Sequence, residues 1–266
     1  MKSLFKNVKL FIKALTGTSI KHNPGATKNY FIFKDHPDIF AINCLKFLNY
    51  DAIKRKKIEL DPYQKYVLNT INSNRQTIFK MPRQSTKSTL SLISAIHYAI
   101  FNDKSKVGIV CFNYSESKRL LDITKQFCDD LNTNKYFEDW VTEINSNSIT
   151  FENGSKIKFC SSRRDSEDYR SFDFLILDEF AFFSSTVVED LSVALSMFPN
   201  KKLAIFSTQK KDSKFNELFW NAMNDIDGSE MIPINIHYRE IPERNRKWRE
   251  ETIRLSGYEC FKEEYM

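Results

Sequence analysis

The chain has 266 residues, of which 41% are hydrophobic, so it is long enough and apolar enough to bury a core in one large domain or two small ones. With 23 phenylalanines and only 6 glycines, the composition suits a globular α/β protein and excludes a collagen-like or disordered chain. The net charge of +6 permits contact with nucleic acid without demonstrating it. The five cysteines show no Cys-x-x-Cys spacing, which argues against a disulfide framework and against a zinc site.

The N-terminal segment is basic and amphipathic. Apolar side chains recur on one face of a predicted helix, with lysines between them: Leu4, Val8, Phe11 and Leu15. This helix either docks on the domain or on a partner, or lies on an anionic membrane surface. No apolar run reaches the roughly 18 residues of a membrane-spanning helix. The polar residues 19–30, with Pro24 and Gly25, are predicted to form a linker.

Residues 37–50 are expected to form a helix, so we divide the chain into an N-terminal helical extension with its linker, 1–58, and a main domain, 59–266. In the main domain, predicted strands alternate with predicted helices. The expected strands are 76–81, 106–112, 148–151, 156–160, 172–177 and 203–207, and the expected helices are 63–72, 88–101, 115–131, 215–224 and 243–255. Asn153-Gly154 predicts a hairpin between the third and fourth strands. The alternation predicts an α/β fold with a central, mostly parallel sheet covered by helices on both faces.

The first segment whose residues can carry out chemistry is the loop between strand 76–81 and the following helix. Lys87 and Ser88 open that helix, where backbone N–H groups can wrap a phosphate, the lysine can neutralise its charge, and the hydroxyl can coordinate Mg²⁺. The pattern GxxxxGK[ST] is incomplete, because Met81 and Thr86 stand at its two glycine positions. A lysine-serine pair by itself equally fits an ordinary helix start. Since a β-branched side chain is stiff where backbone closes on phosphate, Thr86→Gly is expected to raise nucleotide affinity.

The second segment is an apolar strand that ends in Asp178 and Glu179. Ligands collect at the carboxyl edge of a parallel sheet. Asp178 can hold a Mg²⁺ ion with its water shell, and Glu179 can orient and deprotonate an attacking water. The alternative is a strand end followed by a solvated acidic turn. If the first interpretation holds, the Lys87 ammonium lies within ~10 Å of the Asp178 carboxylate, because one Mg-phosphate group bridges them.

The third segment is an apolar strand that ends in Ser207, Thr208 and Gln209. Small hydroxyl and amide groups at this edge can sense a γ-phosphate, although serine and threonine commonly end strands. Upstream, Gln64 presents a donor and an acceptor together, as the edge of adenine does. Its alternative role is that of a surface glutamine at an ordinary helix start.

Together these segments resemble a known family, the ATPase domain of the terminase large subunit of tailed bacteriophages. The resemblance is carried by YQKYVLNTINSNRQTIFKMPRQSTKST, by FENGSKIKFCSSRRDSEDYRSFDFLILDEFAFF and by LAIFSTQKKDSKFNELFW, and it covers residues 35–266. It implies a P-loop NTPase fold of the RecA-like (ASCE) class in 59–266. It also implies that the nuclease domain of full-length terminases is absent, so nuclease activity is not expected from this chain alone.

The resemblance assigns roles residue by residue. It implies catalytic roles for Glu179, Arg83 and Arg170; nucleotide binding by Gln64, Arg83, Gln84, Ser85, Thr86, Lys87, Ser88 and Thr89; metal binding by Ser88 and Asp178; and coupling by Ser207, Thr208 and Gln209. The family lacks the first glycine of the loop as this chain does, but Thr86 departs from its pattern. Ser171 likewise follows Arg170 where the family usually has glycine.

Arg170 resembles an arginine finger that acts on the neighbouring subunit. It lies in a polar loop just before the acidic strand, and we expect it near the rim of the site. The planar guanidinium suits phosphate oxygens and stays charged. The alternative is local pairing with acidic residues of the same loop: Asp165, Glu167 and Asp168.

The function that the resemblance implies is a packaging motor. It would couple hydrolysis of ATP, with Mg²⁺, to translocation of double-stranded DNA into the procapsid. The implied partners are double-stranded DNA, the portal protein, the small terminase subunit and further copies in a ring, expected to be a pentamer on the portal, with a monomer when isolated. The implied place is the host cytoplasm at the portal vertex, without a membrane. Two alternatives stay open: a helicase-like remodelling ATPase, which needs a second RecA-like lobe, and a nucleotide-binding scaffold with weak hydrolysis, which only Thr86 favours.

Overall fold

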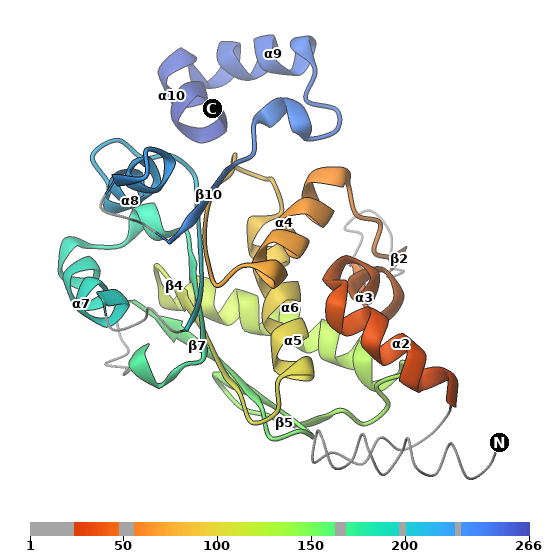
Figure 1. Cartoon of the computed structure of the whole chain (residues 1–266). Coiled ribbons are helices and arrows are strands. Elements are labelled where there is room, and N and C mark those ends of the chain that lie inside the picture. Colours follow the sequence, from red (N-terminus) through yellow and green to blue (C-terminus); the bar gives the residue numbers. More distant parts are fainter. Residues whose placement is uncertain (1–23, 48–55, 163–168, 197–200, 227–229) are drawn as a thin grey trace.

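The chain folds around one eight-stranded sheet. The computed structural model describes residues 24–47, 56–162, 169–196, 201–226 and 230–266. Along the sheet the strands lie in the order β10-β3-β9-β8-β4-β7-β6-β5, so that β10 and β5, both labelled in Figure 1, are the two edge strands. Their bounds are β3 Gln76–Lys80, β4 Lys106–Cys111, β5 Val141–Ile144, β6 Ser148–Phe151, β7 Lys156–Ser161, β8 Phe174–Asp178, β9 Lys202–Ser207 and β10 Ile232–Asn235.

The sheet is parallel except at one end. β10, β3, β9, β8, β4 and β7 pair in parallel, whereas β6 pairs antiparallel with β7 and β5 antiparallel with β6. The predicted hairpin is confirmed, and Gly154 supplies its left-handed turn at φ 78°. Because parallel strands share a direction, the ends of β3, β8 and β9 all lie at one edge. The three segments that carry chemistry therefore meet there.

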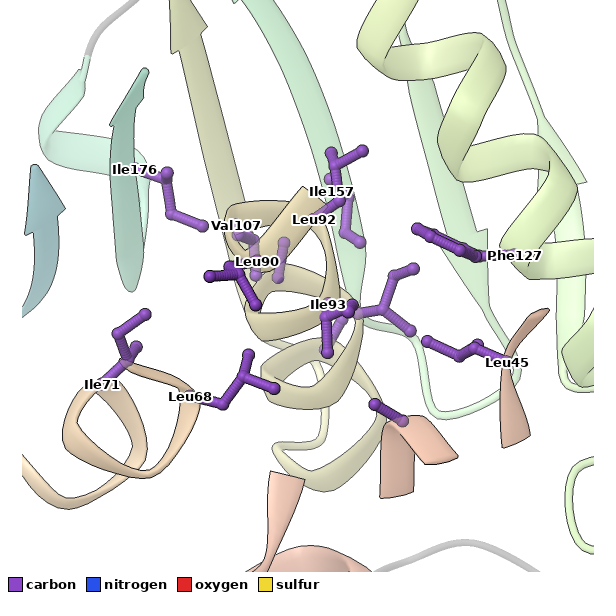
Figure 2. Close-up of a cluster of buried hydrophobic side chains, with 14 of the residues drawn as sticks. Leu45, Leu68, Ile71, Leu90, Leu92, Ile93, Val107, Phe127, Ile157 and Ile176 are labelled. Carbon is purple, nitrogen blue, oxygen red and sulfur yellow. The ribbon is translucent and has the colours of Figure 1, made fainter. Parts of the chain in front are cut away.

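Helices cover both faces of the sheet, as predicted. Strand side chains alternate between two cores: Phe79 and Ile176 face one, Ile78 and Leu177 the other. The first core also contains α4 Pro62–Ser73, α5 Lys87–Phe101 and α6 Tyr114–Asn132, and the second contains α7 Ser185–Ser196 and α8 Lys214–Met223. Figure 2 shows α5 in the first core, with Leu90, Leu92 and Ile93 among side chains of the sheet and of α4. The predicted α/β fold, a mostly parallel sheet with helices on both faces, is thus confirmed.

The N-terminal region packs on the first core. The linker prediction is wrong for 24–30, because α2 spans Pro24–Asp35 and places Phe33 in that core. Proline is tolerated in the first turn of a helix, so Pro24 begins α2 instead of breaking it. The helix predicted over 37–50 ends early: α3 covers Pro37–Cys44, and a short strand, β1 Lys46–Phe47, pairs with β2 Lys56–Lys57. The basic N-terminal helix lies outside the described residues.

Among the strands and α-helices of residues 59–266, the sequence analysis did not predict β5, β10, α7 and the last helix, α10 Tyr258–Tyr265. The helix predicted over 243–255 is observed as α9 Arg246–Ser256. The N-cap prediction for α4 is confirmed, because Asp61 begins it with a capping box that includes Gln64. Cys111 and Cys160 are fully buried, as expected of small apolar side chains, and all five cysteines are free thiols.

Candidate functional site

The loop between β3 and α5 wraps back on itself without any glycine. Gln84 and Thr86 both adopt left-handed backbone, with φ of 55° and 60°. The buried Ser85 hydroxyl donates to the Pro82 carbonyl at 2.6 Å and tightens the turn. Thr86 is the N-cap of the 15-residue helix α5, whose first N–H groups have no partner within the helix. A helix N-terminus below such a loop is suited to an anion.

The structure brings the loop and the acidic pair together. The Lys87 ammonium lies 3.3 Å from Glu179 Oε1 and also donates to the Pro82 carbonyl at 3.1 Å. The Ser88 hydroxyl donates to Asp178 Oδ2 at 2.8 Å. Lys87 is buried to 4% exposure, and Asp178 to 1%. One hydrogen bond and one ion pair therefore join two segments that lie about 90 positions apart in sequence.

The acidic pair is electrostatically strained. Burial, and next the charge of Glu179, raise the pKa of Asp178 to about 7, against the opposing hydrogen bond from Ser88 and the charge of Lys87. Glu179 follows the strand in left-handed backbone, with φ of 56°. Asp178 Oδ1 and Glu179 Oε2 are buried without a hydrogen-bond partner. Cations offset such burial of carboxylates, and this set of donors fits a hydrated Mg²⁺, which uses one or two carboxylates together with substrate phosphates.

The third segment lies against both others. The Ser207 carbonyl accepts from the Met81 N–H at 3.0 Å, and the Ser207 hydroxyl accepts from the Ala181 N–H at 3.1 Å. Ser207 thus ties the start of the phosphate loop, residues 81–88, to the turn after the acidic pair. Thr208 is 3% exposed and its hydroxyl has no hydrogen-bond partner, while Gln209 next to it is half-buried.

A cavity of about 290 Å³ opens among these segments; it is lined by Arg83, Phe112, Glu116, Glu179, Phe182, Thr208 and Glu264. Glu179 and Thr208 thus line a cavity next to the phosphate loop. Of the nucleotide-binding candidates, Arg83, Gln84 and Thr86 are exposed, whereas Thr89 is half-buried in the first turn of α5. Gln64 is buried beside the loop and bonds to Thr86.

The C-terminal helices contact the phosphate loop, which the sequence did not predict. The Arg83 N–H donates to the Glu264 carbonyl at 2.7 Å, and its guanidinium lies 3.4 Å from the Glu264 carboxylate. The Arg244 guanidinium donates to the carbonyls of Arg83 and Gln84 at 2.8 and 2.9 Å, and it stacks on Trp248. These pairs are separated by 160 residues or more, so no local spacing could have revealed them.

Arg170 lies away from the other site residues. It sits in a short 3₁₀ helix, Tyr169–Ser171, that precedes β8, whereas Glu179 follows the last residue of β8. The expectation of a position at the rim of the site is wrong. Strand β8 runs between Arg170 and Glu179, so Arg170 lies at the amino end of the parallel strands and Glu179 at their carboxyl end. Arg170 is exposed, and its carbonyl accepts from the Lys201 ammonium. The acidic residues offered as local partners lie outside the described residues. A role toward a neighbouring subunit stays a prediction.

A family profile that matches most of the chain identifies the family to which the chain belongs. The profile of the family described as terminase large subunit, T4likevirus-type, N-terminal matches residues 78–266. The chain belongs to this family. The resemblance to the terminase large subunit drawn from the three motifs is thereby confirmed.

Solved terminase structures share the fold. The ATPase domain of the Thermus phage P74-26 large terminase matches at a TM-score of 0.57 and 19% identity, over 79% of this chain and 93% of that one. The HK97 bacteriophage large terminase matches at 0.63 and 13%, over 81% of this chain and 46% of that one. The large terminase of a thermophilic bacteriophage, solved with ATP-γ-S, matches at 0.56 and 12%, over 78% and 52%. This terminase chain thus spans about half the length of the last two.

Among its described residues no helix is long and apolar enough to cross a membrane.

Proposed function

We propose that this terminase chain is an ATP-hydrolysing motor that couples hydrolysis to translocation of double-stranded DNA into a procapsid. One observation carries the proposal: the lysine and hydroxyl of the phosphate loop meet the acidic pair, with Lys87 3.3 Å from Glu179 and Ser88 2.8 Å from Asp178. Phosphoryl transfer by P-loop enzymes needs this combination of a cradle, a lysine, a metal-holding hydroxyl and a base. Buried carboxylate oxygens without partners at the same place support it.

Each residue has a task in the proposed mechanism. The N–H groups at the start of α5 and the Lys87 ammonium would bind the phosphates. Ser88 and Asp178 would hold Mg²⁺, whose charge would stabilise negative phosphate oxygens. Glu179 orients a water and accepts its proton. Glu179 now pairs with Lys87 at 3.3 Å, so binding of phosphate draws the lysine away and leaves the carboxylate available as a base.

The remaining nucleotide and coupling residues surround this centre. Arg83, on the cavity wall, supplies a second cation near the phosphates. Thr208 has a buried hydroxyl without a partner beside the cavity, and Ser207 joins the phosphate loop to the turn after the acidic pair. A shift at the γ-phosphate can therefore pass through Ser207 to both segments, which is what a coupling motif requires.

The proposed assembly follows from the family. The chain would act in the host cytoplasm, at the portal vertex, in a ring of identical subunits, with the portal protein, the small terminase subunit and double-stranded DNA as partners. The ATP-γ-S complex of the related terminase supports ATP as the nucleotide. Exposure of Arg170 at the edge of the sheet opposite the phosphate loop suits a finger directed at a neighbour.

The test is ATP turnover by the wild-type chain, Lys87→Ala and Glu179→Gln, each measured without DNA, with double-stranded DNA and with single-stranded DNA. A motor hydrolyses ATP, is stimulated by double-stranded DNA, and loses turnover in both variants. Turnover that neither variant reduces would contradict the proposed site. Stimulation by single-stranded DNA alone would favour the helicase-like alternative, and binding of Mg·ATP without turnover in the wild type would favour the scaffold.

A further inference from the structure

Thr86 occupies the position at which a phosphate loop ordinarily has glycine, and it adopts the conformation for which glycine is used. Its φ and ψ are 60° and 21°. Residues with a Cβ, and β-branched ones above all, rarely enter this left-handed region. Since Thr86 is there nonetheless, other contacts must hold the loop in this shape.

The Thr86 hydroxyl provides those contacts. It accepts a hydrogen bond from the Gln64 side-chain amide at 2.8 Å and donates one to the Ser85 carbonyl at 2.6 Å. The Tyr63 hydroxyl lies further away, 3.4 Å from the Thr86 oxygen. Donor and acceptor capacity of the threonine hydroxyl are therefore both in use within the left-handed turn.

The side-chain oxygen of Gln64 is held by a hydrogen bond as well. This oxygen accepts from the Asp61 N–H at 2.8 Å, which caps α4. Gln64 is only 5% exposed, so most of its side chain is withdrawn from water. The amide thus forms a rigid bridge between the first turn of α4 and the residue that precedes Lys87.

We propose that Gln64 is a positioning residue that acts on the nucleotide through Thr86. Its amide and the threonine hydroxyl together hold the phosphate loop in the shape that glycine gives elsewhere. This inference rests on the proposed function, in that the loop binds phosphate. It also replaces the expectation that Thr86→Gly tightens binding: because the loop already has the required shape, the glycine variant should bind nucleotide about as well as the wild type and no longer depend on Gln64.

The test is a double-mutant cycle read in the affinity for Mg·ADP, measured by calorimetry on the full chain. Gln64→Leu should weaken binding about three- to tenfold in the wild-type background, the range that one lost hydrogen bond gives. In the Thr86→Gly background the same substitution should change affinity less than about twofold. An equal loss in both backgrounds would overturn the inference and assign the effect of Gln64 to direct contact with the base.

Two threonine variants and one control sharpen the cycle. Thr86→Ser keeps the hydroxyl and should bind within about twofold of the wild type, whereas Thr86→Val keeps the shape, loses the hydroxyl and should weaken binding about tenfold. Asn72→Leu removes an amide from the same helix, one that bonds to the Asp35 carbonyl instead, and should leave affinity unchanged. Equal affinities of the serine and valine variants would contradict a role for the hydroxyl.

Failure of the proposed function is distinguishable from failure of this inference. If the wild type binds no Mg·ADP, the nucleotide proposal fails, and the same cycle is then read in the thermal unfolding midpoint. A midpoint drop from Gln64→Leu that shrinks in the Thr86→Gly background supports the bridge. Additive drops contradict it.

Discussion

Replacing Glu179 by glutamine separates chemistry from binding, and the structure predicts opposite effects on the two. Glutamine preserves shape but cannot accept a proton, so turnover should fall roughly 10²- to 10⁴-fold, equivalent to about 3–5 kcal/mol of barrier. Binding should not fall. The Lys87 ammonium, buried to 4% exposure, is now held 3.3 Å from the Glu179 carboxylate, and phosphate must compete for it.

The gain in binding is estimated from the same contact. Glu179 is 26% exposed, so the ion pair contributes far less than its bare Coulomb energy; after screening by solvent we take it as about 1 kcal/mol. Removing the carboxylate charge should then tighten Mg·ADP binding roughly fivefold. Phosphate release under steady-state conditions gives turnover, and calorimetry with Mg·ADP gives affinity.

Glu116→Gln is the matched control. Glu116 lies on the same cavity with similar side-chain exposure, 24% against 26%, but its partner is Arg119 one turn along α6. Removing the Glu116 charge should change turnover less than about threefold, because an ion pair near the surface contributes at most about 1 kcal/mol. Turnover of Glu179→Gln within threefold of the wild type would refute the assignment of the base. Weaker binding by Glu179→Gln would refute the competition for Lys87.

Three further predictions concern the ring and the fold. Arg170→Ala and Lys87→Ala subunits, each inactive alone, should recover hydrolysis when mixed in one ring, because each supplies what the other lacks; no recovery in rings shown to be mixed would remove the trans role. Burial lowers the pKa of His97 from 6.5 to about 4. Between those pH values the unfolded chain binds the proton and the folded chain does not, so the free energy of unfolding should fall as pH falls, by up to about 3 kcal/mol. Urea unfolding across this range should show the slope, and His97→Gln should lose it. Gly108→Ala should destabilise by about 1–3 kcal/mol in urea unfolding, because the new methyl would lie 2.7 Å from the Phe172 ring; Phe172→Leu should restore part of the loss.

The sequence by itself determined the strands that carry the chemistry and the order of the motifs on them. Short apolar runs identified β3, β8 and β9. The parallel arrangement, predicted because strands alternate with helices, brings Lys87, Asp178 and Ser207 to one edge. These inferences succeeded because hydrophobic periodicity is local and strand direction follows from the intervening helices. The left-handed turn at Thr86 could not be read from the sequence in the same way, because threonine does not favour it.

Only the tertiary structure decided which distant groups complete the site and which lie away from it. Arg244 and Glu264 reach the phosphate loop from more than 150 residues along the chain, and Gln64 bonds to Thr86 across two elements. Arg170, close to Glu179 in sequence, lies at the opposite edge of the sheet. The physical reason is the same in each case: whether two side chains meet depends on how whole helices and strands pack. Residues far apart in sequence can therefore be in contact, and residues close in sequence can lie at opposite ends of a strand.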